Sequence, residues 1–368
     1  MSRSAAQRAP RIRRNGRRTA TLVRSFSARI FEISWKRPFV TALGRRTAAC
    51  NVGFTLTLQD GTRGYGEAPA SLAQAHLRPR HLARVLAGLG RWAQGQDAAA
   101  PRPLVEEAWR RHGGESPAAA AFECALLDAW TKSQGLTLAA WLGGKLAAVE
   151  SDITISAWTD SALTAAAAAE AVREGFRTLK VKVGTTFAQD LLRVKTARRA
   201  GGGRPLRFIL DGNQGLTVAS ALRLTEACLK AGANVVLLEQ PLPKTDLKGM
   251  AALTRRAPVP VAADETVLSP QDAARVALAR AASVINIKVA KSGILGSLEI
   301  AAVARAAGLG LMIGCMSETG RGLSASVHLA LGTGFFSFVD LDSDHLLKDR
   351  EPPQDWVRRG AVLSLPGK

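Results

Sequence analysis

The feature that most limits how this chain can fold is a regular alternation of apolar and amphipathic segments after Ser151. Eight short apolar segments are separated by stretches with helical periodicity, such as 162–174, 188–200, 218–231 and 270–280. The strand candidates are 153–156, 178–183, 207–210, 235–238, 259–262, 284–287, 311–313 and 337–339. Eight repeats of this kind favour a closed parallel barrel over an open sheet.

The residues before this repeat follow another order, with strands first and helices afterwards. Alternating patterns predict strands at 25–35 and 49–58, and Asp60-Gly61 indicates a hairpin into 63–67. A helical pattern occupies 76–144. We therefore expect a small α+β domain at 25–148, a barrel at 149–342, and a last segment, 343–368, that runs back toward the first domain.

Three carboxylates follow three successive barrel strands. Asp211, Glu239 and Asp264 come at the ends of the third, fourth and fifth strand candidates. The carboxyl ends of barrel strands converge on one mouth, where like charges are costly unless a cation neutralises them. Oxygen ligands suit Mg²⁺. The alternative is that each acid caps the helix that follows its strand.

Three lysines are predicted to reach the same mouth. Lys180 and Lys182 are two residues apart on the second strand, so both point to one face, and that face is the barrel interior because Leu179, Val181 and Val183 need the helix layer. Lys288 ends the sixth strand, across the mouth. The alternative role for Lys182 and Lys288 is a pair of structural salt bridges to the acids.

Lysines on opposite sides of a bound carboxylate suit proton transfer at its α-carbon. A metal stabilises the negative charge of an enediolate, and neighbouring cations are expected to lower a lysine pKa so that it can act as a base. If one lysine removes a proton and the other returns a proton to the opposite face, the result is epimerisation or racemisation.

Seven sequence motifs resemble those of the enolase superfamily, specifically the muconate-lactonizing subgroup and, within it, the dipeptide epimerases. They are GYGEAPA (64–70), AAAAFECALLDAW (118–130), LKVKVG (179–184), LDGNQG (210–215), LEQP (238–241), ADE (263–265) and INIKVAKSG (285–293). The likeness implies a modified TIM barrel, (β/α)7β, with an N-terminal α+β capping domain. It also implies one Mg²⁺ per subunit on Asp211, Glu239 and Asp264, with Lys182 and Lys288 as the proton-transfer pair.

The same resemblance implies how a substrate is held. The intervals between successive metal and lysine positions from 182 to 288 are 29, 28, 25 and 24 residues, as in Ala-Glu epimerases. Asp340 and Asp342 correspond to a D-x-D pair that grips the free ammonium of a dipeptide, and Lys180 would hold its carboxylate. Thr154, Cys315 and Met316 complete the predicted substrate-binding residues. The predicted enzyme is a Mg²⁺-dependent dipeptide epimerase that inverts the α-carbon of the C-terminal residue by two-base 1,1-proton transfer.

The capping domain departs from the Ala-Glu pattern. Gly44 stands where those epimerases have an arginine that reaches the glutamyl side chain, and Arg45 or Arg46 could replace it. The side-chain preference therefore stays open. Other activities on this scaffold are N-acylamino-acid racemase, o-succinylbenzoate synthase and muconate cycloisomerase; Asp340 and Asp342 argue against them because their substrates offer no ammonium group.

The net charge of +20 invites a nucleic-acid hypothesis, but much of it is local. Residues 1–24 hold eight arginines and no acid, and we predict a disordered basic tail there. A polyanion-binding protein on an inactive barrel is the remote alternative. Four scattered cysteines without a CxxC motif indicate a reducing compartment, so we expect a cytoplasmic protein without membrane spans, and a homo-oligomer.

Overall fold

The computed structural model describes residues 20–71, 74–348, 353 and 355–367, and its largest element is an eight-stranded parallel sheet. Its strands are β5 (Ile153–Ile155), β6 (Thr178–Lys182), β7 (Arg207–Asp211), β8 (Asn234–Glu239), β9 (Val261–Ala263), β10 (Val284–Ile287), β11 (Gly310–Gly314) and β12 (Phe338–Asp340). They pair in chain order. The backbone N–H of Asp152 donates to the carbonyl of Val339 at 2.8 Å and joins the first strand to the last. The sheet thus closes into the predicted barrel.

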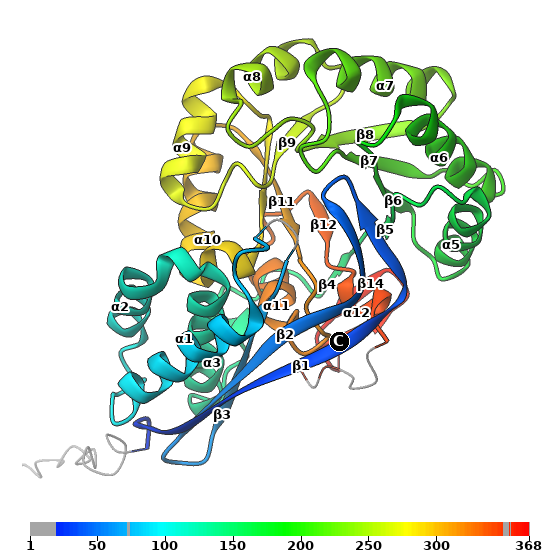
Figure 1. The fold of residues 1–368 in the computed structure, drawn as a ribbon. Helices are drawn as coiled ribbons and strands as arrows, with labels where there is room; N and C mark the ends of the chain where they lie inside the picture. The colour runs from blue at the N-terminus through cyan, green and yellow to red at the C-terminus, as the bar shows by residue number, and fades with distance from the viewer. Residues whose placement is uncertain (1–19, 72–73, 349–352, 354, 368) are drawn as a thin grey trace, which may run out of the picture.

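Seven helices follow the strands and surround the barrel (Figure 1). They are α5 (Ser161–Arg173), α6 (Phe187–Ala200), α7 (Val218–Lys230), α8 (Leu247–Arg256), α9 (Pro270–Ala279), α10 (Val289–Ala306) and α11 (Ser324–Thr333). Thr186, Asp246 and Ser269 each accept a backbone hydrogen bond at the start of a helix, as capping residues do. The predicted (β/α)7β architecture is confirmed, and strand bounds differ from the predicted ones by two residues at most.

Alternation along the strands separates two layers of apolar side chains. Leu179 and Val181 of β6 face the helices and belong to the largest core cluster. A second cluster fills the barrel interior with one residue from each of five strands: Ile209, Leu237, Ala262, Val284 and Met312. Two positions further along the third, fourth and fifth strands come the three predicted metal ligands. Period-two geometry therefore puts these acids on the inner face, just above the barrel core.

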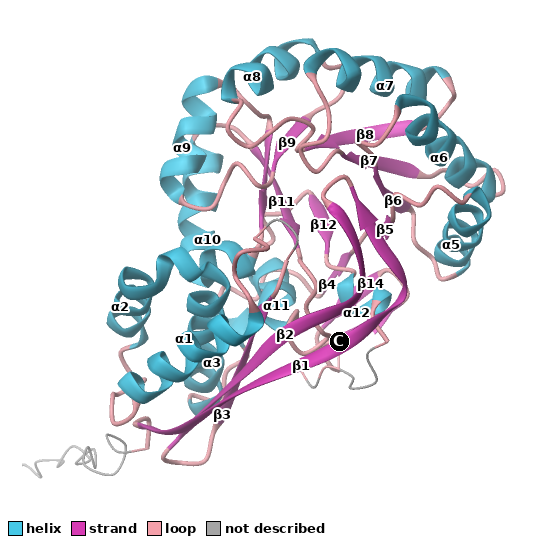
Figure 2. Cartoon of the chain, viewed as in Figure 1, coloured by secondary structure: helices cyan, strands magenta, loops and turns pink. Residues whose placement is uncertain are grey.

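The capping domain is an antiparallel sheet covered by helices. The sheet contains β1 (Val23–Thr41), β2 (Gly44–Leu58) and β3 (Arg63–Pro69), and the helices are α1 (Pro79–Ala93), α2 (Pro101–His112) and α3 (Ser116–Ser133), with the short η1 (Gly113–Glu115) and α4 (Leu138–Trp141). Figure 2 shows the long β1–β2 hairpin reaching toward the barrel mouth. Both strands are longer than predicted. The β1–β2 register shifts between Ser34 and Phe39, around Pro38, so the alternating pattern is lost there although pairing resumes.

The last segment contacts both domains. Leu347, after α12 (Ser343–Leu346), bridges to Trp35 of β1. β13 (Val357–Arg359) and β14 (Val362–Ser364) then form a small sheet with β4 (Ala148–Glu150), at the start of the barrel. Most of the predicted basic tail lies outside the described residues, and its last two residues, Val23 and Arg24, belong to β1.

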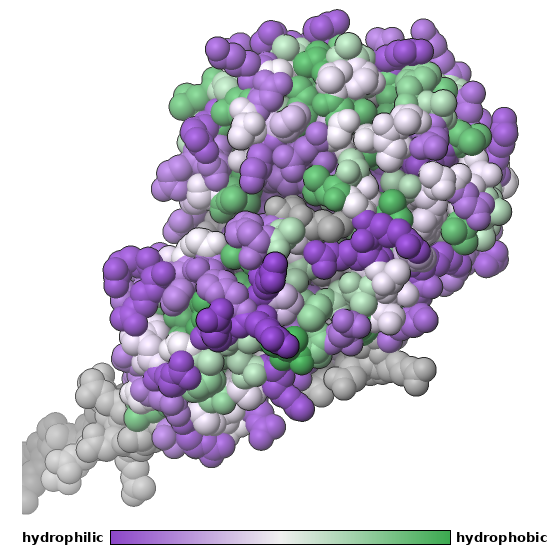
Figure 3. Space-filling view, in the orientation of Figure 1, coloured by the Kyte–Doolittle hydropathy of each residue, from purple (hydrophilic) through white to green (hydrophobic). Residues whose placement is uncertain are grey.

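The surface shown in Figure 3 mixes hydrophilic and hydrophobic residues, with hydrophilic ones frequent over the outer helices. Among the helices that the structure describes, none combines the length and apolar character needed to span a bilayer.

Candidate active site

The three predicted metal ligands lie side by side at the carboxyl ends of neighbouring strands. In the sheet register, Lys182 of β6 is paired with Asp211 of β7, and Asp211 with Glu239 of β8. Asp264 follows β9 directly. All three acids are buried, with at most 2% of each residue exposed. The barrel thus gathers three carboxylates in one water-poor region.

Lys180 lies among these acids instead of beside one of them. Its ammonium Nζ is 2.6 Å from Asp340 Oδ2, 2.9 Å from Glu239 Oε2 and 3.1 Å from Asp211 Oδ2. Burial opposes the charge of this lysine, but the surrounding carboxylates outweigh burial and raise the pKa of Lys180 well above its ordinary value. Lys180 is therefore a fixed positive charge that connects two of the predicted metal ligands to the last strand.

Lys182 and Lys288 stand on opposite sides of the barrel mouth. Lys182 Nζ donates to Asp211 Oδ2 at 2.6 Å and lies 5.7 Å from the centre of the Phe39 ring. Lys288, one residue beyond β10, is 2.7 Å from Asp264 Oδ2. Both ammonium groups border the same cavity. Each proton-transfer candidate thus has its own metal-site carboxylate as partner.

Lys291 is a fourth buried lysine that sequence reasoning missed. Its Nζ donates to Asp264 Oδ1 at 2.7 Å, to the Asp264 carbonyl at 2.6 Å and to the Asn286 carbonyl at 3.1 Å. It belongs to the INIKVAKSG motif, but it lies three residues beyond the strand-end lysine and within α10. The sequence pattern did not indicate its role, because a helix position does not show which strand end the side chain reaches. Two lysines therefore share Asp264.

The protein's own charges and burial shift the pKa values of two of these lysines in opposite directions. Burial lowers the pKa of Lys288, but the charge of Asp264, with Glu239 and Asp340, outweighs it and leaves that pKa above its ordinary value. For Lys291 burial dominates and the pKa is lowered. Carboxylates are thus the nearest charges to Lys288 among the described residues, and the expected lowering of its pKa by a bound metal stays a prediction.

Two amide side chains fix the orientation of the acids. Gln240 Oε1 accepts from the Asp264 N–H at 2.8 Å, so the residue after one metal-site acid supports the backbone of the next. Asn286 Nδ2 donates to Glu239 Oε1 at 2.8 Å.

Lys180 and Lys182 favour the ionised form of Asp211 and lower its pKa despite burial, whereas burial and the Asp211 charge raise the pKa of Glu239.

The acid set suits a hard divalent cation. Asp211, Glu239 and Asp264 offer only oxygen donors, which Mg²⁺ prefers. In the described part of the chain these acids do not form a cluster with ligand atoms within 4.8 Å of one another; Lys180 contacts both Asp211 and Glu239, and Lys288 contacts Asp264. Four buried lysines already face these three acids, so the oxygen donor set, and not an excess of negative charge, is what fits the predicted cation.

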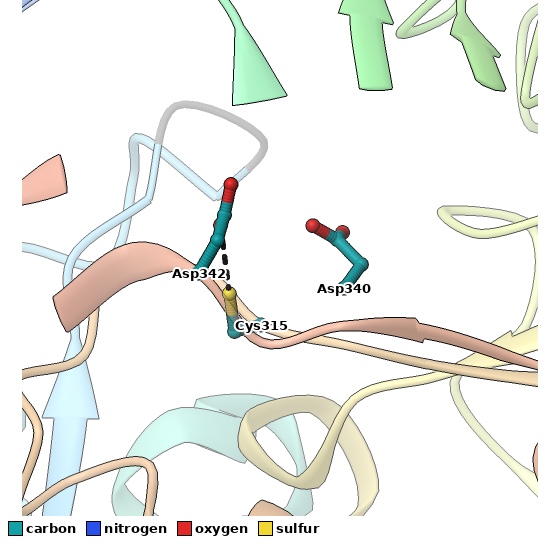
Figure 4. A group of neighbouring side chains, drawn as sticks. All are labelled: Cys315, Asp340 and Asp342. Atoms are coloured by element: carbon teal, nitrogen blue, oxygen red, sulfur yellow. Dashed lines mark hydrogen bonds between the residues drawn. The ribbon is translucent and has the colours of Figure 1, made fainter. Parts of the chain in front are cut away.

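Cys315, Asp340 and Asp342 form a second acidic group (Figure 4), which contacts Lys180 through Asp340. Their ligand atoms lie within 4.8 Å of one another. Asp342 Oδ2 accepts from the Thr154 N–H at 2.6 Å, and the Cys315 thiol is 3.7 Å from Asp342 Oδ1. Burial and the Asp340 charge raise the pKa of Asp342 to about 6. Such a pair gains from a cationic partner such as an ammonium group.

The predicted substrate-binding residues surround one hollow at the mouth. Residues bordering it include Thr154, Lys180, Lys182, Lys288, Cys315, Met316, Asp340 and Asp342. Beside it lies a cavity of about 130 Å³ that extends under the β1–β2 hairpin. The structure thus brings together every predicted substrate-binding residue and both predicted catalytic lysines.

The hairpin distinguishes between the two candidate arginines. Arg46, paired with Phe39, borders the cavity together with Leu43, whereas Arg45 is exposed. Gly44 has φ +141°, which a side chain disfavours, so the turn explains the glycine where the resemblance expects an arginine. Arg46 Nε is buried without a hydrogen-bond partner among the described residues.

Comparisons with known proteins agree with this geometry. The family described as "Mandelate racemase / muconate lactonizing enzyme, N-terminal domain" matches residues 25–143, and "Enolase C-terminal domain-like" matches 163–367. An aromatic dipeptide epimerase of Herpetosiphon aurantiacus is 36% identical over 94% of this chain and 96% of its own length. For the L-Ala-D/L-Glu epimerase of Bacillus subtilis the identity is 34%, over 90% and 91%.

A solved dipeptide epimerase of Enterococcus faecalis, in complex with Mg and the dipeptide L-Leu-L-Tyr, has a TM-score of 0.86. It is 30% identical, and the match covers 93% of this chain and 97% of that one. A barrel with strand-end acids and lysines under an α+β cap defines the enolase-type class. Within that class, the chain belongs to the mandelate racemase/muconate lactonizing enzyme family. The predictions of fold, family and an isomerase of the racemase and epimerase kind are confirmed.

Proposed function

We propose that this protein is a Mg²⁺-dependent dipeptide epimerase that inverts the α-carbon of the C-terminal residue. One observation carries the proposal: Lys182 and Lys288 border one cavity from strands on opposite sides of the barrel, next to buried acids. Relatives named as dipeptide epimerases over nearly the whole chain support the substrate class. One Mg²⁺ per subunit, held by Asp211, Glu239 and Asp264, would supply positive charge against the anion that develops on the substrate carboxylate.

The chain's own residues would hold the two ends of the dipeptide. Asp340 and Asp342 offer negative charge to its free ammonium group, and Lys180 offers positive charge to its carboxylate. Thr154 fixes Asp342 through its backbone N–H, while Cys315 and Met316 form part of the wall. The substrate's α-carbon would then lie between the two lysines.

Proton transfer uses the two lysines in opposite protonation states. A neutral lysine on one side takes the α-proton, the C–H electron pair moves into the carboxylate, and an enediolate forms. The ammonium of the opposite lysine then delivers a proton to the other face, so the configuration inverts and no co-reactant is consumed. Lys182 and Lys288 exchange these roles for the two epimers.

The test uses the Mg²⁺-loaded protein and a dipeptide library in D₂O. We expect a mass gain of one deuterium at the C-terminal residue's α-carbon, with formation of the other epimer, and loss of both when EDTA removes the metal. Absence of exchange with every dipeptide would refute the proposal. Exchange with N-acylated amino acids but not with free dipeptides would favour N-acylamino-acid racemase instead, because those substrates need no ammonium-binding acids.

Three further tests concern the whole protein. Size-exclusion chromatography with light scattering tests the expected homo-oligomer. Fractionation of cells tests the expected cytoplasmic location. Steeply salt-dependent DNA binding by the full chain, absent after removal of residues 1–24, would support the remote polyanion-binding alternative.

A further inference from the structure

A carboxylate of the capping domain contacts the barrel beside the lysine-bearing loop. Glu123 lies on α3, and none of its surface is exposed. Its Oε1 accepts the backbone N–H groups of Ile294 at 2.9 Å and Leu295 at 2.7 Å, both in α10 of the barrel. Its Oε2 accepts from Trp109 Nε1 at 2.6 Å. One side chain thus links three groups in two domains.

These bonds fall where α10 is interrupted. Gly293 has φ +67° and ψ −173°, so the helix divides there into a first turn and a longer second part. A β-carbon at Gly293 would lie 1.9 Å from Glu123 Oε2, so the glycine permits the carboxylate to approach. Glu123 thereby supplies the acceptor that the amides at the start of the second part need, as a capping residue would.

The short first part of α10 carries the chemistry. It begins directly after Lys288 and contains Lys291, and the Lys291 N–H donates to the Lys288 carbonyl at 2.8 Å. Lys291 in turn holds Asp264. A shift of the α10 kink would therefore move a proton-transfer lysine and a metal-site acid together.

We propose that Glu123 is a positioning residue for Lys288: the capping domain fixes the kinked start of α10, and through it the second proton-transfer group. This inference rests on the proposed epimerase function. Small displacements of a reacting group reduce rate strongly, because about 1 Å can cost on the order of a hundredfold. The effect belongs to kcat, since Glu123 borders no part of the substrate cavity.

A second capping-domain carboxylate provides a contrasting case. Glu67 accepts from the Thr319 N–H at 3.0 Å and from Thr319 Oγ1 at 2.6 Å. Its partner Asn51 donates to the Ser317 carbonyl at 2.7 Å. Glu67 therefore holds the loop after β11, which carries the cavity residue Met316 but no proton-transfer group. A change at Glu67 should alter KM more than kcat.

The experiment compares E123Q, E67Q and D128N. In E123Q the new amide cannot accept both the two backbone N–H groups and Trp109 Nε1, so one donor is left facing an NH₂ group. We expect kcat to fall about tenfold to a hundredfold with KM changed less than about threefold. The primary deuterium isotope effect should rise for the epimer whose α-proton faces Lys288. In the double variant E123Q/W109F the Trp109 Nε1–H donor is absent. The glutamine amide then faces no unpaired donor, and part of the kcat lost in E123Q should be recovered.

The control residue Asp128 lies on the same helix and accepts the Tyr65 N–H at 3.0 Å within the capping domain. D128N should leave both kinetic constants near wild type. Hydrogen–deuterium exchange of a peptide containing Ile294 and Leu295 gives a readout independent of activity, and it should accelerate in E123Q only. Equal isotope effects and exchange in E123Q and D128N would overturn the positioning role. If wild type exchanges no substrate proton, the proposed function is refuted instead. The amide-exchange result would still show whether Glu123 holds the backbone at Ile294 and Leu295.

Discussion

Lys182 and Lys288 face the same cavity, but the chain holds them in different ways. Lys182 lies within β6, with its backbone in the ladder with β7 and its carbonyl bound by Arg193 Nη1 at 3.0 Å. Lys288 lies beyond its strand, at the start of a helix that the capping domain contacts through Glu123. The backbone of Lys182 is thus held within the barrel, although its ammonium group lies near Phe39 of the capping domain, whereas the backbone at Lys288 is held by both domains. Changes in the capping domain should therefore affect proton transfer on one face of the substrate more than on the other.

The most direct test of this difference between Lys182 and Lys288 is to replace each lysine in turn. Lys182→Gln and Lys288→Gln should each lower epimerisation about a thousandfold, because one step loses its general acid or base. Each variant should keep deuterium exchange for one epimer only, measured by ¹H NMR in D₂O. Loss of exchange from both epimers in both variants would show that the lysines do not act on separate faces.

The next test removes the lysine behind Asp264. Lys291→Met removes the lysine donor of Asp264 Oδ1 and of two backbone carbonyl groups, while Lys288 still holds Oδ2, so the unfolding free energy should fall by about 3 kcal/mol. Weaker Mg²⁺ binding, by about tenfold, should appear in calorimetric titration. Lys132→Met is the control: its ion pair with Asp128 is exposed and should cost at most about 1 kcal/mol. Equal denaturant midpoints for the two variants would contradict the structural role of Lys291.

Much of the fold and of the mouth could be predicted because both follow from local periodicity. The acids and Lys182 sit on strand positions that alternate with core residues, so the pattern of Leu179 to Val183 was sufficient. Lys291 was missed because a helix position gives no sign of which strand end it reaches. Glu123 lies in an alanine-rich helix, and its two partners in the barrel, Ile294 and Leu295, are more than 170 residues away. A contact between two domains produces no periodic pattern in the sequence from which it could be predicted.

The buried carboxyl group of Glu123 also predicts a pH dependence of the free energy of unfolding. Burial raises the pKa of Glu123 to about 7 despite its three N–H donors, whereas in the unfolded chain it would titrate near 4.5. The folded state thus holds a proton that the unfolded state has lost. The contribution of Glu123 to the free energy of unfolding is therefore largest below about pH 4.5. It decreases, by up to about 3 kcal/mol, as the pH rises to about 7.

Urea unfolding of wild type and E123Q at several pH values isolates this contribution, since only one titratable group differs. The wild-type advantage should decrease from pH 5 to pH 7. A constant difference would place the pKa of Glu123 near its ordinary value and indicate that the N–H groups of α10 compensate its burial.

The smallest expected effect concerns the hairpin over the Lys182 side. Arg46→Ala should lower kcat/KM for dipeptides with an acidic C-terminal side chain about tenfold, because a charged hydrogen bond is lost, and change the value for apolar ones little. Arg45→Ala, at the exposed neighbouring position, should leave both values unchanged. Equal losses for acidic and apolar dipeptides in Arg46→Ala would remove Arg46 from side-chain selection.

The hydrogen bonds that close the barrel have a consequence for how the enzyme is made. Asp152 and Thr154 of the first strand region bond to Val339 and Asp342 of the last, at sequence separations of 187 and 188 residues. Contacts of such large sequence separation form late, because the entropy of closing the loop is lost before they contribute. We therefore expect a growing chain to fold its cap and most of its barrel while the side proposed to bind the ammonium group is still absent. Binding competence should arise in one late step, after residue 342 has left the ribosome.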